Sequence, residues 1–480
     1  MSESDDLQEL GLLTGTRKAS QNSPSPWIIR AIKLALCSVA VSVFLVTIVH
    51  LKRAPSRQQV LDRLFPASQR RTWAQYAPYA PVAEARGPPE GCTVSQVNIL
   101  QRHGARFPTA GAAARILAAL SKIQSATSFN DPNLEFLRNY EYALGTDDMV
   151  PYGAEESFDS GVEAYWRYQH LVSDQILPFI RSDKSQRDVD SAWNWTAGFS
   201  TASRHKLKPV VSFIVDAAAR NNTLDGSQCP GAGRGEEQTD QWLATHYPQV
   251  TARLNANAPG AELTDENTYN LISLCPFETV AYLKKSPWCT LFESIPNAFD
   301  GFEYTGDLDK FYKTGYGQYL GPVQGVGYMN ELVARLTESP VRDQTQTNHS
   351  VDDFPYTFPL NRTLYLDFSH DNQMIAIFSA MGLFRQPQPL DPTEPDPDRT
   401  WRVSAMVPFA GRMVVERLNC SQSGREARSQ KMVRILVQDQ VQPLEFCGAS
   451  ENGLCTLDAF VDSQAYARNK GEGDWEKCFE

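Results

Sequence analysis

Residues 101–109, which read Gln-Arg-His-Gly-Ala-Arg-Phe-Pro-Thr, constrain the fold of this chain more than any other segment. Just before them, residues 92–100 alternate apolar and polar side chains and end on Ile-Leu, a pattern that predicts a buried strand. Gly104 and Pro108 then interrupt regular structure. Arg102, His103 and Arg106 are therefore expected on a loop at the strand's carboxyl end, where open α/β sheets bind ligands.

Arg102 and Arg106 flank His103 on this predicted loop. Guanidinium groups bind phosphate oxygens bidentately, and their charge keeps a nearby imidazole neutral and nucleophilic. A charged surface loop explains the tripeptide Arg-His-Gly equally well. The full string RHGARFPT is more specific, because it resembles the active-site signature of histidine acid phosphatases in the form found in fungal phytases. This resemblance implies a covalent phosphohistidine mechanism with His103 as nucleophile.

A second segment, residues 364–372, reads LYLDFSHDN and opens into a predicted helix over residues 373–383. A His-Asp pair alone would fit a solvated turn. Together with RHGARFPT, it resembles the second signature of the family, which implies that His370 binds the phosphate and Asp371 protonates the leaving oxygen. Neighbouring phosphate raises the pKa of a carboxyl group, so we expect an acidic pH optimum.

A third cationic contact is expected between these two segments. Residues 177–181 (LPFIR), followed by Arg187, resemble the Phe-x-Arg element of the family. This resemblance assigns Arg181 to phosphate binding and leaves Arg187 as structural. Arg204, in SRHKLKP, competes for the role of Arg181, but its sequence context matches less well.

Four further stretches also resemble fungal phytases: residues 148–161, 320–336, 407–420 and 473–479. The resemblance covers nearly all of residues 92–480. It implies a phosphoglycerate-mutase-like, doubly wound sheet domain with an α-helical insertion. It also implies four disulfides, which are Cys92–Cys420, Cys229–Cys478, Cys275–Cys289 and Cys447–Cys455.

The periodicity of the chain predicts the same α/β class, with strands near both ends and a helical middle. We expect the α/β part at about residues 92–130 and 321–480 and the helical insertion at about 131–320. The expected helices include residues 110–124, 155–180 and 204–219, the expected strands include 363–368, 405–409 and 433–437, and residues 231–235 are expected to form a loop.

One departure from the family bears on the substrate. Fungal phytases usually carry several lysines just after the signature, where they contact the outer phosphates of phytate. Here residues 110–115 offer only Arg115, although Lys310 resembles a retained pocket lysine, with Lys313 close by. Each lost contact would cost on the order of 1 kcal/mol or more. We therefore expect phosphate-ester chemistry with a weaker preference for phytate.

The 480-residue chain carries 45 basic and 56 acidic residues, a net charge of −11. This balance argues against a nucleic-acid-binding protein, whose affinity would come from a basic face. Neither a CxxC pair nor a Cys/His cluster suggests zinc, and the implied mechanism needs no metal or cofactor. The expected partner is a small phosphomonoester, and a site for it must be locally basic.

Cysteines and glycosylation sequons indicate the secretory pathway. Eight of the nine cysteines follow residue 90, and the ninth, Cys37, lies in an apolar segment. Sequons occur at Asn194, Asn221, Asn348, Asn361 and Asn419. Even cysteines together with several sequons are typical of an oxidising compartment.

The first 91 residues divide into three expected segments. Residues 1–26 are polar and Ser-rich and are expected to be disordered, and residues 50–91 are Pro-rich and are expected to form a stalk. Residues 27–49 contain the uncharged run 34–49, somewhat short of the roughly 20 residues that span a bilayer. A cleaved signal peptide fits less well, because about 30 residues precede the run and no Ala-x-Ala pattern follows it. We expect a type II signal anchor, with the catalytic domain in the secretory lumen or outside the cell.

Three function classes follow from these features. The first is an acid phosphomonoesterase with phytate as leading substrate, or a broad acid phosphatase. The second is a mutase or transferase on the same scaffold, which Asp371 and the secretory features disfavour. The third is an inactive, membrane-tethered binding protein, ranked last because every expected catalytic residue has a candidate.

Overall fold

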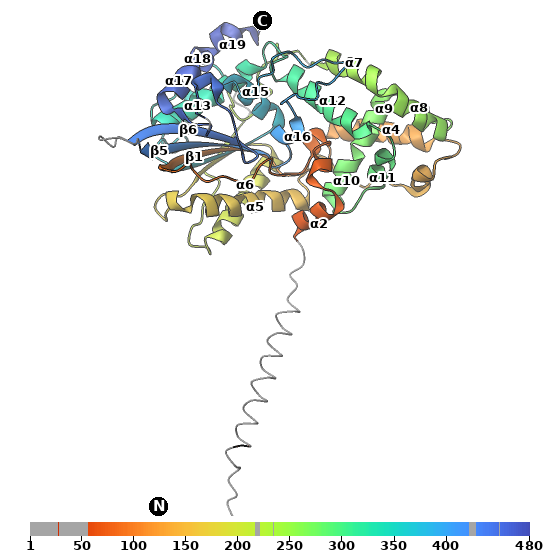
Figure 1. Ribbon diagram of the computed structural model, residues 1–480, viewed down its shortest axis with the longest axis horizontal. Coiled ribbons are helices and arrows are strands. Elements are labelled where there is room, and N and C mark those ends of the chain that lie inside the picture. The colour runs from red at the N-terminus through yellow and green to blue at the C-terminus, as the bar shows by residue number, and fades with distance from the viewer. Residues whose placement is uncertain (1–26, 28–55, 217–220, 234, 422–428, 451) are drawn as a thin grey trace, which may run out of the picture. The chain divides into compact units, whose positions relative to one another are not determined.

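The computed structural model describes residues 56–216, 221–233, 235–421, 429–450 and 452–480, together with Trp27. Residues 57–480 form one compact unit (Figure 1). Its centre is an eight-stranded sheet of order β3-β2-β4-β1-β5-β6-β7, with β8 paired to β6. The first four of these strands are parallel and the others antiparallel, which confirms the α/β class.

Strand β1 (Cys92–Arg102) lies in the middle of the sheet, parallel to β4 (Leu364–Ser369) and antiparallel to β5 (Arg412–Ser421). Its successive side chains point to opposite faces, and both faces are buried: Ile99 belongs to one apolar cluster and Leu100 to the other. The remaining strands are β2 (Phe179–Asp183), β3 (Phe213–Val215), β6 (Ser429–Val437), β7 (Gln440–Val441) and β8 (Cys455–Thr456).

Helices cover both faces of the sheet. On one face lie α5 (Pro151–Tyr168) and α6 (Gln186–Ala202), and on the other lie α13 (Val326–Thr337) and α15 (Asp371–Met381) (Figure 1). This arrangement matches the expected doubly wound sheet. The expected helix at residues 110–124 is confirmed as α4 (Ala110–Gln124), whose N-cap residue Thr109 accepts a hydrogen bond from the Ala112 amide.

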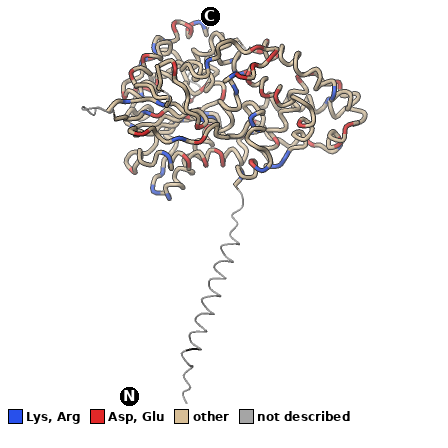
Figure 2. Tube along the Cα trace, viewed as in Figure 1, with Lys and Arg blue, Asp and Glu red and all other residues tan. Residues whose placement is uncertain are grey.

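A helical region lies beside the sheet and packs around α12 (Ala298–Lys313). Its other helices are α7 (Glu236–His246), α8 (Pro248–Asn257), α9 (Asp265–Ile272), α10 (Leu274–Tyr282) and α11 (Pro287–Glu293). Acidic and basic residues are interspersed over both regions (Figure 2). The net negative charge is therefore not gathered on one of them.

Short helices complete the unit. The α-helical ones are α2 (Arg57–Leu64), α3 (Ala67–Arg70), α14 (His349–Asp352), α16 (Val403–Met406), α17 (Leu457–Ser463), α18 (Ala465–Arg468) and α19 (Asp474–Lys477). The 3-10 turns are η1 (Ala74–Tyr76), η2 (Pro132–Asn139), η3 (Gln169–Leu171), η4 (Pro322–Gly325), η5 (Glu445–Cys447) and η6 (Lys470–Gly473).

Two expectations about elements need correction. The predicted insertion at 131–320 is too wide, because β2, β3 and the helices α5 and α6 that pack on the sheet all lie within it. The strand expected at residues 405–409 is absent, since residues 403–406 form α16 instead. Expected strands at 363–368 and 433–437 are confirmed within β4 and β6.

The predicted stalk at residues 50–91 also differs from the structure. From Arg57 onward this stretch belongs to the compact unit, and Leu61, Phe65 and Trp73 are fully buried in its main core. The prolines interrupt regular periodicity, which hid these apolar contacts from pattern analysis. The globular part therefore begins about 35 residues before the expected boundary.

All four implied disulfides are confirmed: Cys92–Cys420, Cys229–Cys478, Cys275–Cys289 and Cys447–Cys455. Two sequon asparagines, Asn361 and Asn419, are exposed. The other three, Asn194, Asn221 and Asn348, are half-buried.

The expected tail at 1–26 and nearly all of the expected anchor at 27–49 lie outside the described residues. Within the part of the chain that is described, no helix combines the length and the apolar character needed to cross a membrane.

Candidate active site

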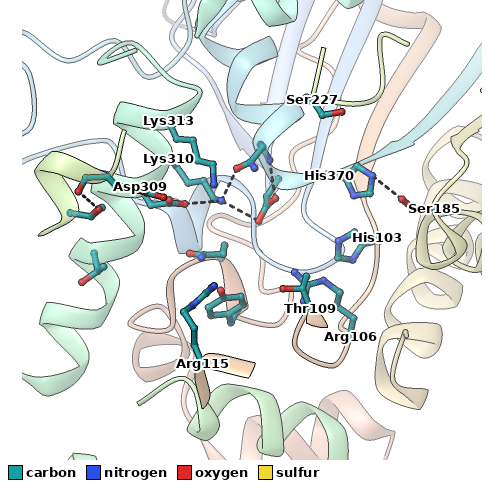
Figure 3. Close-up of a pocket in the computed structure, with 18 of the residues that line it drawn as sticks. His103, Arg106, Thr109, Arg115, Ser185, Ser227, Asp309, Lys310, Lys313 and His370 are labelled. Atoms are coloured by element: carbon teal, nitrogen blue, oxygen red, sulfur yellow. Dashed lines mark hydrogen bonds and ion pairs between the residues drawn. The ribbon is translucent and has the colours of Figure 1, made fainter. Parts of the chain in front are cut away.

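A cavity of about 820 Å³ opens where β1, β2 and β4 end. His103, Arg106, His370 and Asp371 all lie on its wall, as the strand-end argument predicted. Figure 3 shows His103 beside His370, with Lys310 and Lys313 of α12 across the pocket from them. The sheet thus supplies one wall and the helical region the other.

The signature loop is held in place by the first turns of α5. A Cβ atom on Gly104 would lie 2.1 Å from the Gly153 carbonyl oxygen, and one on Gly153 would lie 2.1 Å from the Ala105 oxygen. Only glycine permits so close a backbone approach on both sides. The buried Glu156 carboxylate accepts hydrogen bonds from the amides of Ala105 (2.8 Å) and Tyr79 (2.9 Å). Segments from three parts of the chain therefore fix this loop.

His103 is 1% exposed, and its Nδ1 lies 2.9 Å from the Gly104 carbonyl oxygen. A carbonyl only accepts, so Nδ1 carries the proton and Nε2 keeps its lone pair. Burial, reinforced by the charges of Arg102, Arg106 and Arg187, holds the pKa of His103 well below its usual value. The imidazole is therefore neutral and nucleophilic, as expected from the flanking arginines.

Arg102 lies behind the cavity wall. Its Nη1 donates to the carbonyl oxygens of Gln75 (2.5 Å) and Val407 (2.8 Å), and its guanidinium lies over the Phe409 ring. Its Nη2 is 3.0 Å from Asp371 Oδ2. Arg106, by contrast, lies on the wall. Burial lowers the pKa of Arg106 to about 10, which leaves it charged at acidic and neutral pH.

His370 lies close to two carboxylates. Its Nε2 is 3.0 Å from Asp183 Oδ2 and 3.3 Å from Asp188 Oδ2. Burial alone would lower the pKa of His370, but Asp188 and Asp183 outweigh it, and the pKa is raised. His370 is thus a cation, and the centre of its ring lies 5.7 Å from that of His103. These three side chains each offer one ligand atom, all within 4.8 Å of one another, so the same group could also hold a metal ion.

The structure reverses the assignment of Arg181 and Arg187. Arg181 lies inside β2 and is fully paired, with Nε 2.7 Å from Asp367 Oδ1 and Nη2 2.5 Å from Glu331 Oε2. It does not reach the cavity, whereas Arg187 lines it, with Nη2 3.5 Å from His370 Nδ1. Of the two arginines, Arg187 is therefore the one placed where it could contact a ligand in the cavity. Arg204 is exposed and lies outside the wall of the cavity.

Asp371 differs from expectation in its charge. Burial would raise the pKa of this carboxyl, but Arg102, Lys310 and Arg106 hold the pKa well below its usual value. Asp371 is therefore ionised in the free site. The negative charge of a bound phosphate would offset these cations and raise the pKa of Asp371 again. The Asp371 carboxyl can therefore hold a proton once a phosphate ester is bound.

The wall of the cavity carries both basic and acidic side chains. Lys310, as expected, lies on the wall, with Nζ 2.7 Å from Asn372 Oδ1 and 3.0 Å from Asp309 Oδ2. In addition to Lys310 and the two histidines, the basic residues on the wall are Arg106, Arg115, Lys184, Arg187 and Lys313. The carboxylates on the wall are Asp183, Asp225, Glu236, Asp240, Glu266, Asp309 and Asp371.

Asp183 and Asp188, which charge His370, were missed in the sequence. They belong to the run SDKSQRD at residues 182–188, which follows a strand that periodicity did not reveal. Because ligand-binding residues of α/β sheets follow the carboxyl ends of strands, a recognised β2 would have marked this run as part of the site. Glu156, which supports the signature loop from α5, has no such signal.

Residues 93–438 match the histidine phosphatase superfamily (branch 2). Phytase A of Neurospora crassa is 38% identical over 470 residues, covering 85% of this chain and 92% of the relative. Phytase A of Arthroderma benhamiae is 39% identical over 427 residues, covering 85% and 91%.

Two solved structures share the fold. The phytase from D. castellii aligns with a TM-score of 0.68 at 20% identity, covering 87% of this chain and 89% of that one. A multiple inositol polyphosphate phosphatase of Bifidobacterium longum, in complex with inositol hexasulfate, aligns with a TM-score of 0.59 at 14% identity, covering 81% and 96%. The family match, the Phytase A relatives and the paired histidines agree: this chain belongs to the histidine phosphatase superfamily, branch 2.

Proposed function

We propose that this chain is an acid phosphomonoesterase that releases phosphate from phytate (myo-inositol hexakisphosphate) and similar esters. The observation that carries the proposal is the neutral, buried His103 facing a cationic His370 in a pocket with Arg106 and Arg187. A nucleophile surrounded by fixed cations suits phosphoryl transfer, in which positioning and charge stabilisation supply most of the catalysis. The Phytase A relatives point to the inositol ester.

In the first step, His103 Nε2 attacks phosphorus, a nitrogen–phosphorus bond forms, and the bond to the ester oxygen breaks. Arg106, Arg187 and His370 stabilise the charge on the equatorial oxygens. Asp371 takes up a proton from solvent when the negative substrate binds and offsets the cations around it. Arg102 orients this carboxyl group, which transfers the proton to the leaving oxygen so that an alcohol departs.

In the second step, water attacks the phosphohistidine. The Asp371 carboxylate, left ionised by the first step, accepts a proton from this water. The nitrogen–phosphorus bond then breaks, and inorganic phosphate leaves the neutral His103 ready for another cycle. When phosphate leaves, Arg102, Lys310 and Arg106 again lower the pKa of Asp371, which releases this proton to solvent. Each residue is then back in its starting state.

A broad acid phosphatase is the second candidate. It is favoured by the carboxylates of Asp225, Glu236, Asp240 and Glu266 on the cavity wall. A hexakisphosphate would meet these like charges, whereas a monophosphate bound at His103 would not extend to all of them.

The test compares phosphate release by the full chain and its His103→Ala variant from phytate and from p-nitrophenyl phosphate, across about pH 2.5 to 7. Release from both esters that disappears in the variant would support the phosphohistidine step. The ratio of the two kcat/KM values would then separate a phytase from a general phosphatase. Equal inertness of both proteins would defeat the proposal and favour a binding role.

We propose further that residues 27–49 anchor the chain as a single-pass type II membrane protein with a lumenal or extracellular catalytic domain. The uncharged run at residues 34–49, the four disulfides and the five sequons support this topology. Resistance to alkaline carbonate extraction and a loss of mass on deglycosylation are expected. Release of the full chain by carbonate would refute the anchor.

A further inference from the structure

A second cavity, of about 840 Å³, lies apart from the catalytic one, and the two share no lining residue. Its wall is formed by the end of α3, the chain after α15, the α16 segment and residues around β7 and η5. Nothing in the proposed mechanism uses this cavity. Its size is sufficient for a small organic ligand.

The charge of this wall is unusual for a chain with a net charge of −11. Arg71, Arg385, Arg399 and Arg402 lie on it, and among the described residues that line it Glu445 is the one carboxylate. Arg399 is already paired, with Nε 2.8 Å from Asp307 Oδ2. The cavity is therefore a local concentration of positive charge.

The other three arginines keep donors for a ligand. Arg71 donates to the Pro81 carbonyl oxygen (3.0 Å), Arg402 donates to that of Pro397 (2.8 Å), and Arg385 lies over the Tyr316 ring. In the part of the chain that the structure describes, none of the three forms an ion pair. Each guanidinium has five N–H donors, so most of them remain available to an anion.

The wall also has an apolar part. Leu383, Phe384, Met406 and Phe446 line it together with the arginines. Apolar side chains with a few convergent charged groups are typical of sites for organic ligands, because the apolar part supplies affinity and the charges fix the orientation. A free inorganic anion would contact the arginines but not the apolar side chains.

The cavity is linked to the catalytic site through two chain segments. Arg71 and Thr72 line the second cavity, and the same segment continues to Gln75, whose carbonyl oxygen holds Arg102. Met406 lines it too, and the next carbonyl, that of Val407, is the other acceptor of Arg102.

A side chain joins the two segments to each other. Ser404 Oγ donates to the Arg71 carbonyl oxygen (2.7 Å), and the Glu303 carboxylate of α12 accepts from the amides of Ala74 (2.5 Å) and Ser404 (3.2 Å). A ligand that draws Arg71 and Arg402 together would therefore act on both carbonyl groups that hold Arg102.

We propose that this second cavity binds an amphipathic organic anion, with its charged group on Arg71, Arg385 and Arg402 and its apolar body against Phe384 and Phe446. Binding there changes the position of Arg102 and so the affinity of the catalytic site for phosphate esters. The binding site itself does not depend on the proposed function.

The test uses the full chain and naphthalene-2-sulfonate, a non-hydrolysable aromatic anion, in isothermal titration calorimetry. One molecule should bind per chain, more tightly than inorganic sulfate does. Affinity should fall at least about ten-fold in the Arg71→Gln/Arg402→Gln double variant, because charge-assisted bonds to two guanidinium groups are lost. Arg385→Gln alone, a change at an exposed side chain, should weaken binding in the same direction.

Two matched variants decide the location. Arg342→Gln alters an exposed arginine outside both cavities and should leave the affinity unchanged. If affinity is lost in Arg187→Gln instead of the Arg71/Arg402 variant, the ligand occupies the catalytic cavity and the proposal fails. Absence of binding, or equal binding of sulfate, also overturns it. Binding that leaves the KM for p-nitrophenyl phosphate unchanged overturns the coupling to Arg102.

Discussion

The two arginines Arg181 and Arg187, six residues apart, should differ sharply when each is replaced by methionine. Arg181 lies in a buried network with Asp367 and Glu331. In Arg181→Met, Asp367 keeps Arg335, whose Nη1 is 2.6 Å away. Glu331 loses the guanidinium of Arg181 and keeps only neutral donors, among them the Thr223 hydroxyl at 2.9 Å. A buried carboxylate left without its partner costs about 3–5 kcal/mol of folding free energy.

Arg187→Met should instead preserve stability and lose activity. Arg187 is half-buried on the cavity wall, and replacing it removes one charged hydrogen bond to the bound phosphate. Such a bond contributes about 1.5–3 kcal/mol. The loss in kcat/KM is then about ten- to 150-fold. Because Arg187 also lowers the pKa of His103, the acid limb of the pH profile should move to higher pH.

The assays are unfolding in urea and phosphate release from p-nitrophenyl phosphate, both on the full chain. Arg181→Met should lower the urea midpoint, and the fraction that stays folded should retain its kcat/KM. Arg187→Met should keep the midpoint of the parent chain. An active Arg187→Met protein, beside a stable but inactive Arg181→Met protein, would refute the placement of both side chains.

Three further predictions concern the site. Asp371→Asn should slow hydrolysis of an alkyl phosphate about 10²- to 10⁴-fold but affect p-nitrophenyl phosphate much less, since that leaving group needs little protonation; equal losses would remove Asp371 as proton donor. Asp188 is the largest of the charges that raise the pKa of His370, so His370 should lose its proton at a lower pH in Asp188→Asn than in the parent. KM for p-nitrophenyl phosphate should therefore begin to rise at a lower pH in this variant, and coincident curves would contradict this. Gly153→Ala places a Cβ 2.1 Å from the Ala105 oxygen, so it should reduce both kcat and the thermal midpoint, and unchanged kinetics would show that the loop tolerates the shift.

The sequence predicted the catalytic centre well because its motifs stand at the ends of two strands with clear apolar patterns. His103 follows β1 and His370 follows β4, and parallel neighbouring strands bring their carboxyl ends together. The motif residues Arg106, Asp371 and Lys310 lie on the same cavity wall.

The prediction at the third strand end, that of β2, was wrong for a physical reason. β2 has only five residues, all buried, and it follows a stretch with helical spacing that runs into it. Because the sequence pattern does not show where β2 ends, it cannot tell that Arg181 lies inside this strand and Arg187 on the following helix α6. Arg181 points into the protein and Arg187 reaches the pocket, a difference that depends on tertiary packing and not on local pattern.

Buried charges hid another strand. β5 carries Arg412, Glu416 and Arg417 at buried positions, which breaks the apolar pattern expected of a central strand. Glu416 is satisfied by Arg434 of β6 and by the Tyr168 hydroxyl, both distant in sequence. Such pairing is decided only when the strands meet, so periodicity could not reveal it.

The contact between α2 and α5 has a mechanical consequence. The Arg57 amide and guanidinium donate to Glu155, and the guanidinium also donates to the Pro151 carbonyl oxygen. Gly153, in the same turn of α5, abuts Gly104 beside the nucleophile. In a chain anchored through residues 27–49, any pulling force enters the domain at Arg57 and reaches the turn that supports His103. Tension on such a tether and turnover at the pocket would then be coupled.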